Sequence, residues 1–204
     1  MNISVDRLAV TLLGVVVGIS TAACGVDAAD LATSSPAFTI PGIQSLPAAA
    51  ATPGTTLTQG QPAKVLFVAN GQRRGLISLS IDSVRTGRSS DLANFILNAG
   101  AKASTPYYAD VTVTKASGGQ IGGAPVPLYG VNGHHTLLPA AVLRGGFKKC
   151  QVARIPDDLG QGASFSTCLM FLAPGHGRLT SVEFEYAPDV APITWVVHPR
   201  PAQH

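Results

Sequence analysis

The sequence predicts an all-β fold, an antiparallel sandwich of two sheets with about seven strands and one short helix. Three observations support this prediction. Segments in which apolar and polar residues alternate recur from residue 61 onward, turn-forming residues separate them, and only 12% of the 204 residues are charged. The 22 glycines and 15 prolines favour short strands joined by turns over long helices.

The first 60 residues differ in composition from the rest. After Arg7 an uncharged apolar stretch runs from Leu8 to Ile19 and small residues follow, which is typical of an export signal and too short for a comfortable membrane span. We therefore assign residues 1–23 to a signal peptide. Residues 24–60 are rich in Pro, Ala and Thr and contain no basic residue, which predicts a disordered tether. A cleaved propeptide has a similar composition.

Cys24 directly follows the small residues Thr21-Ala22-Ala23. This arrangement resembles a bacterial lipobox, whose cysteine is lipidated and becomes the new N-terminus, although Thr21 stands where Leu, Val or Ile is usual. The alternative is ordinary cleavage after Ala23 or at Val26-Asp27-Ala28, which leaves Cys24 unmodified or removes it. We expect lipidation of Cys24, because an unpaired cysteine in an exported protein otherwise needs an explanation.

The strands of the domain, assigned to residues 61–204, follow from period-two alternation. In residues 75–84, Ile77, Leu79 and Ile81 fall on one face and polar residues on the other. The segment 89–97 is the exception, because Leu92, Phe95 and Ile96 have helical spacing. The predicted strands lie within residues 63–69, 75–84, 106–115, 126–131, 164–173, 181–186 and 192–197.

Several blocks in this order carry a family resemblance: "SSDLANFIL", "STPYYADVTVTKASGG", "VPLYGVNG", "FKKCQ", "FSTCLMFLAPGHGRLTSVEFEY" and "PITWVV". With them, roughly residues 61–197 resemble uncharacterised actinobacterial secreted lipoproteins that contain an immunoglobulin-like, telokin-like β-sandwich. The resemblance implies an exported immunoglobulin-like domain with a disulfide between Cys150 and Cys168. The blocks include no catalytic signature, so no activity is carried over.

The cysteine count agrees with this interpretation. An exported domain lies in an oxidising compartment, where a pair such as Cys150 and Cys168 is usually bonded. Their spacing matches neither a redox CxxC motif nor a structural zinc site. The predicted disulfide leaves Cys24 as the unpaired cysteine, which favours its lipidation.

The histidines and basic residues are candidates for binding. His134 and His135 lie in a predicted turn, where they could hold copper, nickel or zinc with His176 or could be ordinary surface residues. Residues 144–154 concentrate four basic side chains, a candidate surface for anionic lipid head groups or acidic wall polymers, or a solvated loop. The basic side chains are Arg144, Lys148, Lys149 and Arg154, and His198 and His204 near the C-terminus are weaker metal candidates.

The remaining polar and aromatic groups do not predict an active site. Asp157-Asp158, Glu183 and Glu185 are expected to face solvent, and Trp195 and Tyr107-Tyr108 to belong to the core and a strand surface. The sequence contains no nucleophile elbow, zinc-protease motif or phosphate-binding loop.

These features together predict an interaction module. We expect a non-enzymatic exported protein without a cofactor, held outside the cytoplasm on the cell membrane by a lipid anchor. Its expected partner is an envelope protein or wall polymer, and nucleic acid is not expected because the chain has no aromatic-basic binding stripe. Two alternatives stay open: a small-ligand or metal carrier of the envelope, and a hydrolase assembled from scattered residues.

Overall fold

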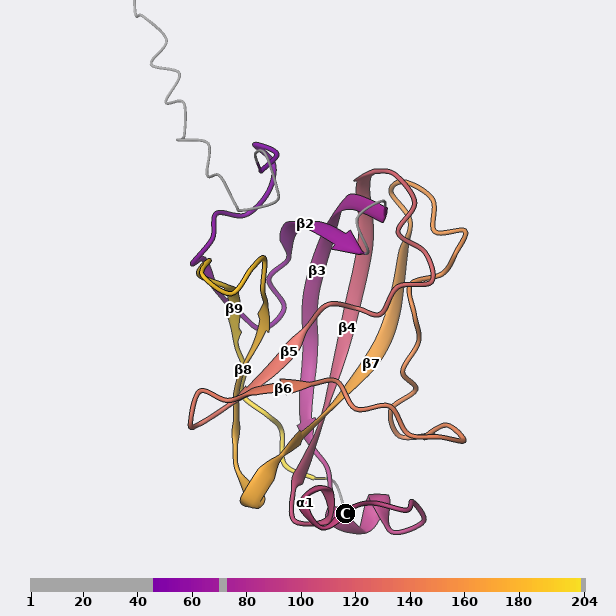
Figure 1. Ribbon diagram of the computed structural model, residues 1–204, viewed down its shortest axis with the longest axis vertical. Helices are drawn as coiled ribbons and strands as arrows, with labels where there is room; N and C mark the ends of the chain where they lie inside the picture. The colour runs from indigo at the N-terminus through magenta and orange to yellow at the C-terminus, as the bar shows by residue number, and fades with distance from the viewer. Residues whose placement is uncertain (1–45, 70–72, 203–204) are drawn as a thin grey trace, which may run out of the picture. The chain divides into compact units, whose positions relative to one another are not determined.

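A computed structural model of the chain describes residues 46–69 and 73–202. They form nine strands in two sheets that pack face to face, which confirms the predicted all-β sandwich (Figure 1). The predicted signal peptide, Cys24 and His204 lie outside the described residues. No helix among the described residues is long and apolar enough to cross a membrane.

The first sheet is antiparallel throughout, in the order β2-β3-β4-β7. Its long strands lie side by side in Figure 1, with β5 and β6 crossing in front of them. Ile77, Leu79 and Ile81 are fully buried on the inner face, as the alternation predicted. The strands are β2 (Ala63–Ala69), β3 (Arg73–Thr86), β4 (Thr105–Gly118) and β7 (Ser164–Ala173).

The second sheet has the order β1-β9-β8-β5-β6. Its pairs are antiparallel except for β1 and β9, which run parallel with Leu57 opposite Trp195. The antiparallel prediction is therefore wrong at this one pair. The strands are β1 (Thr56–Thr58), β5 (Tyr129–Asn132), β6 (Leu137–Pro139), β8 (Leu179–Phe184) and β9 (Ile193–Val196).

The folded domain begins before residue 61, so the predicted tether of residues 24–60 extends too far along the chain. Ala51 and Leu57 pack against the core, and β1 forms an edge of the second sheet. The side-chain Oε1 of Gln61 accepts a hydrogen bond from the Thr58 backbone N–H at 2.8 Å. A strand of three residues is too short to show alternation, and its Thr-rich composition resembles that of the preceding segment.

The predicted helix at 89–97 is replaced by two short turns of helix. A 3₁₀ helix, η1 (Ser89–Leu92), is followed by α1 (Ala99–Lys102), which Asn98 caps by accepting the Ala101 N–H. Leu92 is buried but Ile96 is fully exposed, so the apolar spacing does not produce one continuous helix. A new helical turn begins after Asn98 instead, because the Asn98 side chain accepts the Ala101 backbone N–H and caps that turn.

The main core lies between the two sheets. Trp195 is fully buried there and donates its Nε1–H to the carbonyl of Gln61 at 2.8 Å, which confirms its prediction as a core residue. Tyr107 is also buried in this core, with its hydroxyl donating to the carbonyl of Gly177.

Candidate functional site

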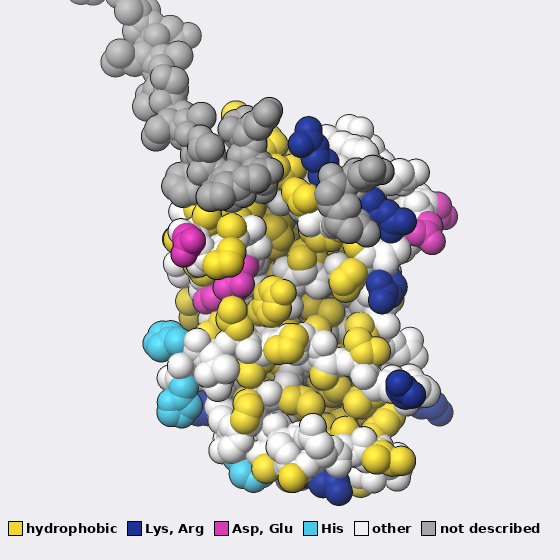
Figure 2. All heavy atoms as spheres, viewed as in Figure 1, with side chains coloured by type: hydrophobic (Ala, Val, Ile, Leu, Met, Phe, Trp, Pro, Cys, Tyr) yellow, Lys and Arg dark blue, Asp and Glu magenta, His cyan; other side chains and the backbone are white. Residues whose placement is uncertain are grey.

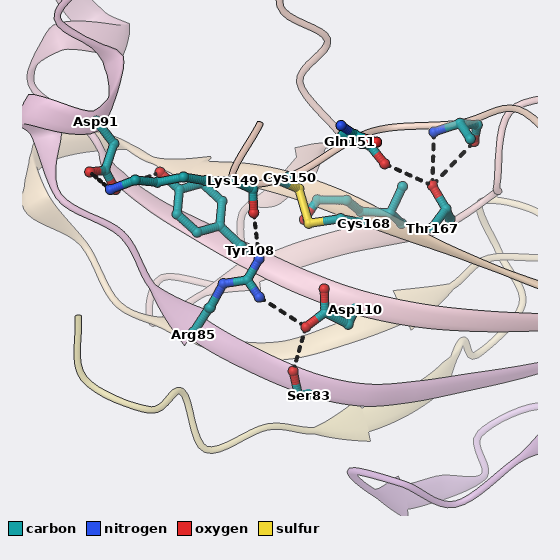
Figure 3. Close-up of a disulfide and its surroundings, with 12 residues drawn as sticks. Ser83, Arg85, Asp91, Tyr108, Asp110, Lys149, Cys150, Gln151, Thr167 and Cys168 are labelled. Carbon is teal, nitrogen blue, oxygen red and sulfur yellow. Dashed lines mark hydrogen bonds and ion pairs between the residues drawn. A yellow bond between two sulfur atoms is a disulfide. The ribbon is translucent and has the colours of Figure 1, made fainter. Parts of the chain in front are cut away.

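A disulfide joins Cys150 to Cys168 on the outer face of the first sheet, as predicted (Figure 3). The two Cα atoms are 5.1 Å apart. The Gln151 carbonyl accepts the Cys168 N–H, and the Thr167 hydroxyl accepts the Ala153 N–H at 2.8 Å. The bond therefore fixes the segment 147–153, named here the disulfide segment, along β7.

The disulfide segment and η1 cover a second hydrophobic cluster. Tyr108 and Met170 face away from the main core but are buried together with Leu92 and the two cysteines. The Phe147 ring lies 5.5 Å from the Tyr108 ring, measured between centroids. Tyr108 was expected on a strand surface, and it is buried because chain segments far away in sequence pack over it.

Asp91 is the polar centre of this region. Its carboxylate accepts the Tyr108 hydroxyl at 3.0 Å and the Arg88 backbone N–H at 3.0 Å, and it forms an ion pair with Lys149 (Figure 3). Burial by itself raises the pKa of Asp91, but the bonds from Lys149, Arg88 and Tyr108 outweigh it, so the pKa lies below its usual value. Burial and the neighbouring Asp91 charge raise the pKa of Tyr108.

Arg85 links three parts of the chain. Its guanidinium donates to Asp110 of β4 at 2.9 Å and to the carbonyl of Lys149 in the disulfide segment, and it lies 5.5 Å above the Tyr108 ring (Figure 3). The Ser83 hydroxyl also donates to Asp110. Arg85 thus holds the disulfide segment against the sheet.

A β-bulge determines that Arg85 faces outward. The pairing of β3 with β4 shifts between Ile81 and Ser83, so Asp82 is an additional residue in β3. Residues 77, 79 and 81 point inward before the bulge, whereas Val84 is the buried residue after it. Without the bulge, alternation would direct Arg85 into the core.

Four cationic side chains meet in a pocket of about 520 Å³ beside this network. We name it the basic pocket. Arg200 lines it from the C-terminal segment. The backbone N–H of Arg200 donates to the Val84 carbonyl, and its backbone carbonyl accepts the Thr86 N–H. The pocket is lined by Arg85, Arg88, Lys149, Arg200, Asp91 and Tyr108, with Thr86, Pro201 and Ala202.

Sequence reasoning identified only Lys149 among the cations of the basic pocket. The other three come from positions 85, 88 and 200, which share no local motif. The predicted basic segment does not gather in one hollow, because Arg154 donates to the carbonyl of Gly123 and lines a different groove. Pairing of β3 with the C-terminal segment could have been found only from the fold.

The second hollow is an apolar groove of about 520 Å³. Val68 is 42% exposed in its wall, and the Arg73 and Arg154 side chains donate to carbonyls of Gly122 and Gly123 near one end. Figure 2 shows hydrophobic side chains spread over the face on which β2, β5 and β6 lie. The groove is lined by Phe67–Ala69, Arg73, Gly123–Tyr129, Pro139, Ala140 and Arg154.

The four candidate metal-binding histidines that fall within the described residues are all exposed. His134 and His135 occupy the turn between β5 and β6, where the Asn132 side chain accepts the backbone N–H groups of His134 and Thr136. His176 lies in the 3₁₀ helix η2 (Pro174–His176), and His198 lines a separate surface hollow. Among the described residues no group of three or more His, Cys, Asp or Glu side chains is placed to hold a metal ion.

The remaining carboxylates have ordinary partners or face solvent. Glu183 accepts the hydroxyls of Ser181 and Thr194, both on its own sheet. Asp157 and Asp158 are exposed, as expected, and Glu185 is partly exposed. None of these carboxylates lines the basic pocket or the apolar groove.

Comparison with family models, with curated proteins and with solved structures finds no match to this chain. Its candidate sites are therefore defined by their own geometry. They are the basic pocket, with converging cations, and the apolar groove.

Proposed function

We propose that the chain is a non-enzymatic, exported and lipid-anchored β-sandwich protein that acts as an interaction module of the cell envelope. The observation that carries this proposal is the Cys150–Cys168 disulfide, because structural disulfides belong to oxidising compartments outside the cytoplasm. It uses both cysteines of the domain and leaves Cys24 for a different purpose. The resemblance to secreted actinobacterial lipoproteins supports the same proposal.

Lipidation of Cys24 would place the domain at a membrane surface. One acyl chain binds a bilayer only marginally, whereas two or more give stable anchoring. An envelope protein or an acidic wall polymer is the partner class that we propose, because Lys and Arg outnumber Asp and Glu in the domain.

Replacing Cys24 tests the anchor. In the native host, we expect Cys24→Ala to move folded protein from the membrane to the soluble fraction or to leave the signal uncleaved. Thr21→Leu is the matched control, because it supplies the usual lipobox residue and keeps the cysteine. Mass spectrometry of the wild-type N-terminus gives the direct answer: a diacylglycerol-modified Cys24 supports the proposal, and an unmodified terminus at Cys24 or Ala29 contradicts it.

The apolar groove favours a second candidate function, a carrier of a small apolar ligand. Its volume of about 520 Å³ lies in the range of small-molecule sites, and Val, Ala, Pro and Leu side chains form much of its wall. Native mass spectrometry of the exported protein would detect a bound molecule. We expect Val68→Lys to abolish that binding and Val142→Lys, at an exposed position outside the groove, to leave it unchanged.

A further inference from the structure

We propose that the loops covering the second hydrophobic cluster form a surface that docks on an anionic lipid bilayer. We name it the loop surface, and it comprises residues 95–97, Lys102 and residues 141–148. The proposal does not require lipidation of Cys24, because this surface would bind a bilayer by itself. It rests on two exposed apolar side chains, on the cations beside them and on the contact that joins the two loops.

Two apolar side chains of the loop surface are exposed although their neighbours are covered. Ile96 is fully exposed, whereas Phe95 and Leu97 on either side of it pack against the second hydrophobic cluster. Val142 is 74% exposed, and the residues on both sides of it pack against the same cluster. Insertion of Ile96 and Val142 among lipid acyl chains is favourable, because it removes their apolar area from water.

The two loops belong to one surface because their aromatic rings are in contact. The ring centroids of Phe95 and Phe147 are 5.8 Å apart, in an edge-to-face arrangement. In Figure 1 the loop that precedes α1 and the loop that follows β6 project from the same side of the first sheet. The disulfide of Cys150 holds one loop in place, and the buried Leu92 holds the other. The loop surface can therefore meet a bilayer without a large rearrangement of the protein.

Cations lie beside the exposed apolar residues. The side chains of Lys102, Arg144 and Lys148 are exposed and make no hydrogen bond or ion pair within the part of the chain that the structure describes. Lys148 lines the same hollow as Val142, and Lys102 lines the same hollow as Phe95. These charges are therefore free to meet anionic lipid head groups.

The charge of the two loops favours an anionic partner. Asp91 is the only carboxylate in residues 88–104 and 141–149, and its charge is balanced by the ion pair with Lys149. Arg88 is left out of the count, because it interacts with other residues of the protein. Three free cations remain in these loops, and each strengthens binding to an anionic membrane surface about fivefold.

The exposed apolar residues distinguish a bilayer from an acidic polymer. A wall polymer would pair with the cations but would leave Ile96 and Val142 in water, whereas the interface of a bilayer accepts both kinds of side chain. Figure 2 shows hydrophobic side chains beside Lys and Arg side chains at the lower right of the molecule, where the two loops project in Figure 1. So small a surface binds weakly and reversibly, and it would orient the domain once another anchor holds it near the membrane.

Fluorescence of the full exported chain mixed with vesicles tests the proposal. Ile96→Trp places an indole on the loop surface, and the one native tryptophan, Trp195, is fully buried. We expect a brominated lipid to quench the introduced indole in vesicles of phosphatidylglycerol but not of phosphatidylcholine, and the quenching to decrease as ionic strength rises. Val196→Trp, at an exposed position of β9, is the matched control and should not be quenched.

Further variants of the Ile96→Trp chain separate the charged from the apolar contribution. We expect Lys148→Gln to lower the docking constant derived from the quenching about fivefold. Lys64→Gln is the matched control, because it removes the charge of an exposed residue of β2, and it should leave the constant unchanged. Val142→Ser should also weaken docking, because less apolar area is buried. Circular dichroism of each variant confirms that the fold is retained.

Four results would overturn the proposal: no quenching with phosphatidylglycerol, equal quenching with phosphatidylcholine, equal quenching of Val196→Trp, or equal losses in Lys148→Gln and Lys64→Gln. Poly-L-glutamate tests the polymer alternative. If it binds as tightly as phosphatidylglycerol vesicles and Val142→Ser weakens neither, the loop surface recognises charge alone and the bilayer proposal is wrong. These outcomes are independent of Cys24, whose modification is measured separately by mass spectrometry.

Discussion

The outer face of the first sheet has two ends that differ sharply, although both are built from the same strand. Toward one end of β4, Tyr108 is buried under η1 and the disulfide segment. Toward the other end, Thr112 and Thr114 share hydrogen bonds with Ser166 and Ser164 of β7 and stay partly open to solvent. Alternation determines which residues face outward, whereas distant segments determine which of those residues become buried.

The difference extends to charge. Asp110 lies between the two ends and binds Arg85, which reaches toward the covered end. Beyond it, Thr112 donates its hydroxyl to Asp82, the residue added by the bulge in β3. The covered end therefore combines a hydrophobic cluster with the basic pocket, and the open end is a hydrogen-bonded polar surface.

Truncating Tyr108 should give the largest difference in stability between the covered and the open end of the sheet. We expect Tyr108→Ala to lower the free energy of unfolding by about 3–5 kcal/mol, because it leaves a cavity and removes the hydroxyl partner of Asp91. Thr112→Ala, four residues further along β4 on the same face, should cost about 1 kcal/mol or less. Urea unfolding of both variants measures the difference, and similar values would show that the cluster over Tyr108 adds little.

Removing the disulfide tests whether the disulfide segment stabilises only the end of the sheet around Tyr108. We expect the double variant Cys150→Ala with Cys168→Ala to lose about 3 kcal/mol, the chain-entropy value for a loop of this length. Hydrogen exchange should lose protection around Tyr108 and the disulfide segment, while the amides of Thr112 and Thr114 keep theirs. Uniform loss of protection along β4 would mean that the disulfide stabilises the sandwich as a whole.

Asp91 provides the smallest of the three effects and a dependence on pH. Its folded-state pKa lies below the unfolded value, so its contribution to stability is complete above about pH 4 and is lost as pH falls through the folded pKa. We expect Asp91→Asn to cost about 1–2 kcal/mol near pH 7, and the gap from wild type to narrow below about pH 4. Urea unfolding at several pH values measures the gap, and a constant gap would contradict the role of the carboxylate charge.

Much of the sandwich could be predicted from the sequence because its long strands alternate clearly. The bounds predicted for residues 63–69 and 164–173 match β2 and β7, and Trp195 is in the core as expected. The short strands β1 and β6 were missed, since three residues cannot establish a period. β1 is held in place by β9, from the other end of the described chain, and β6 pairs with β5, which directly precedes it.

The candidate sites were harder to predict than the fold. The disulfide followed from compartment and cysteine number, but the basic pocket depends on a bulge at Asp82 and on the contact of Arg200 with β3. Simple alternation would have placed Arg85 in the core. The basic pocket is therefore formed by residues that lie far apart in the sequence, and no short sequence motif predicts it.

The parallel pairing of β1 with β9 has a mechanical consequence. Strands near the two ends of the described chain lie side by side and run in the same direction, with Thr56 opposite Thr194 and Thr58 opposite Val196. Tension applied to the two ends pulls these strands past each other, so their hydrogen bonds are loaded together in shear and are not opened one by one. The pairing with β9 therefore lets β1 resist a steady force on the two ends of the domain. The rate of forced unfolding would depend on how long the hydrogen bonds between β1 and β9 hold.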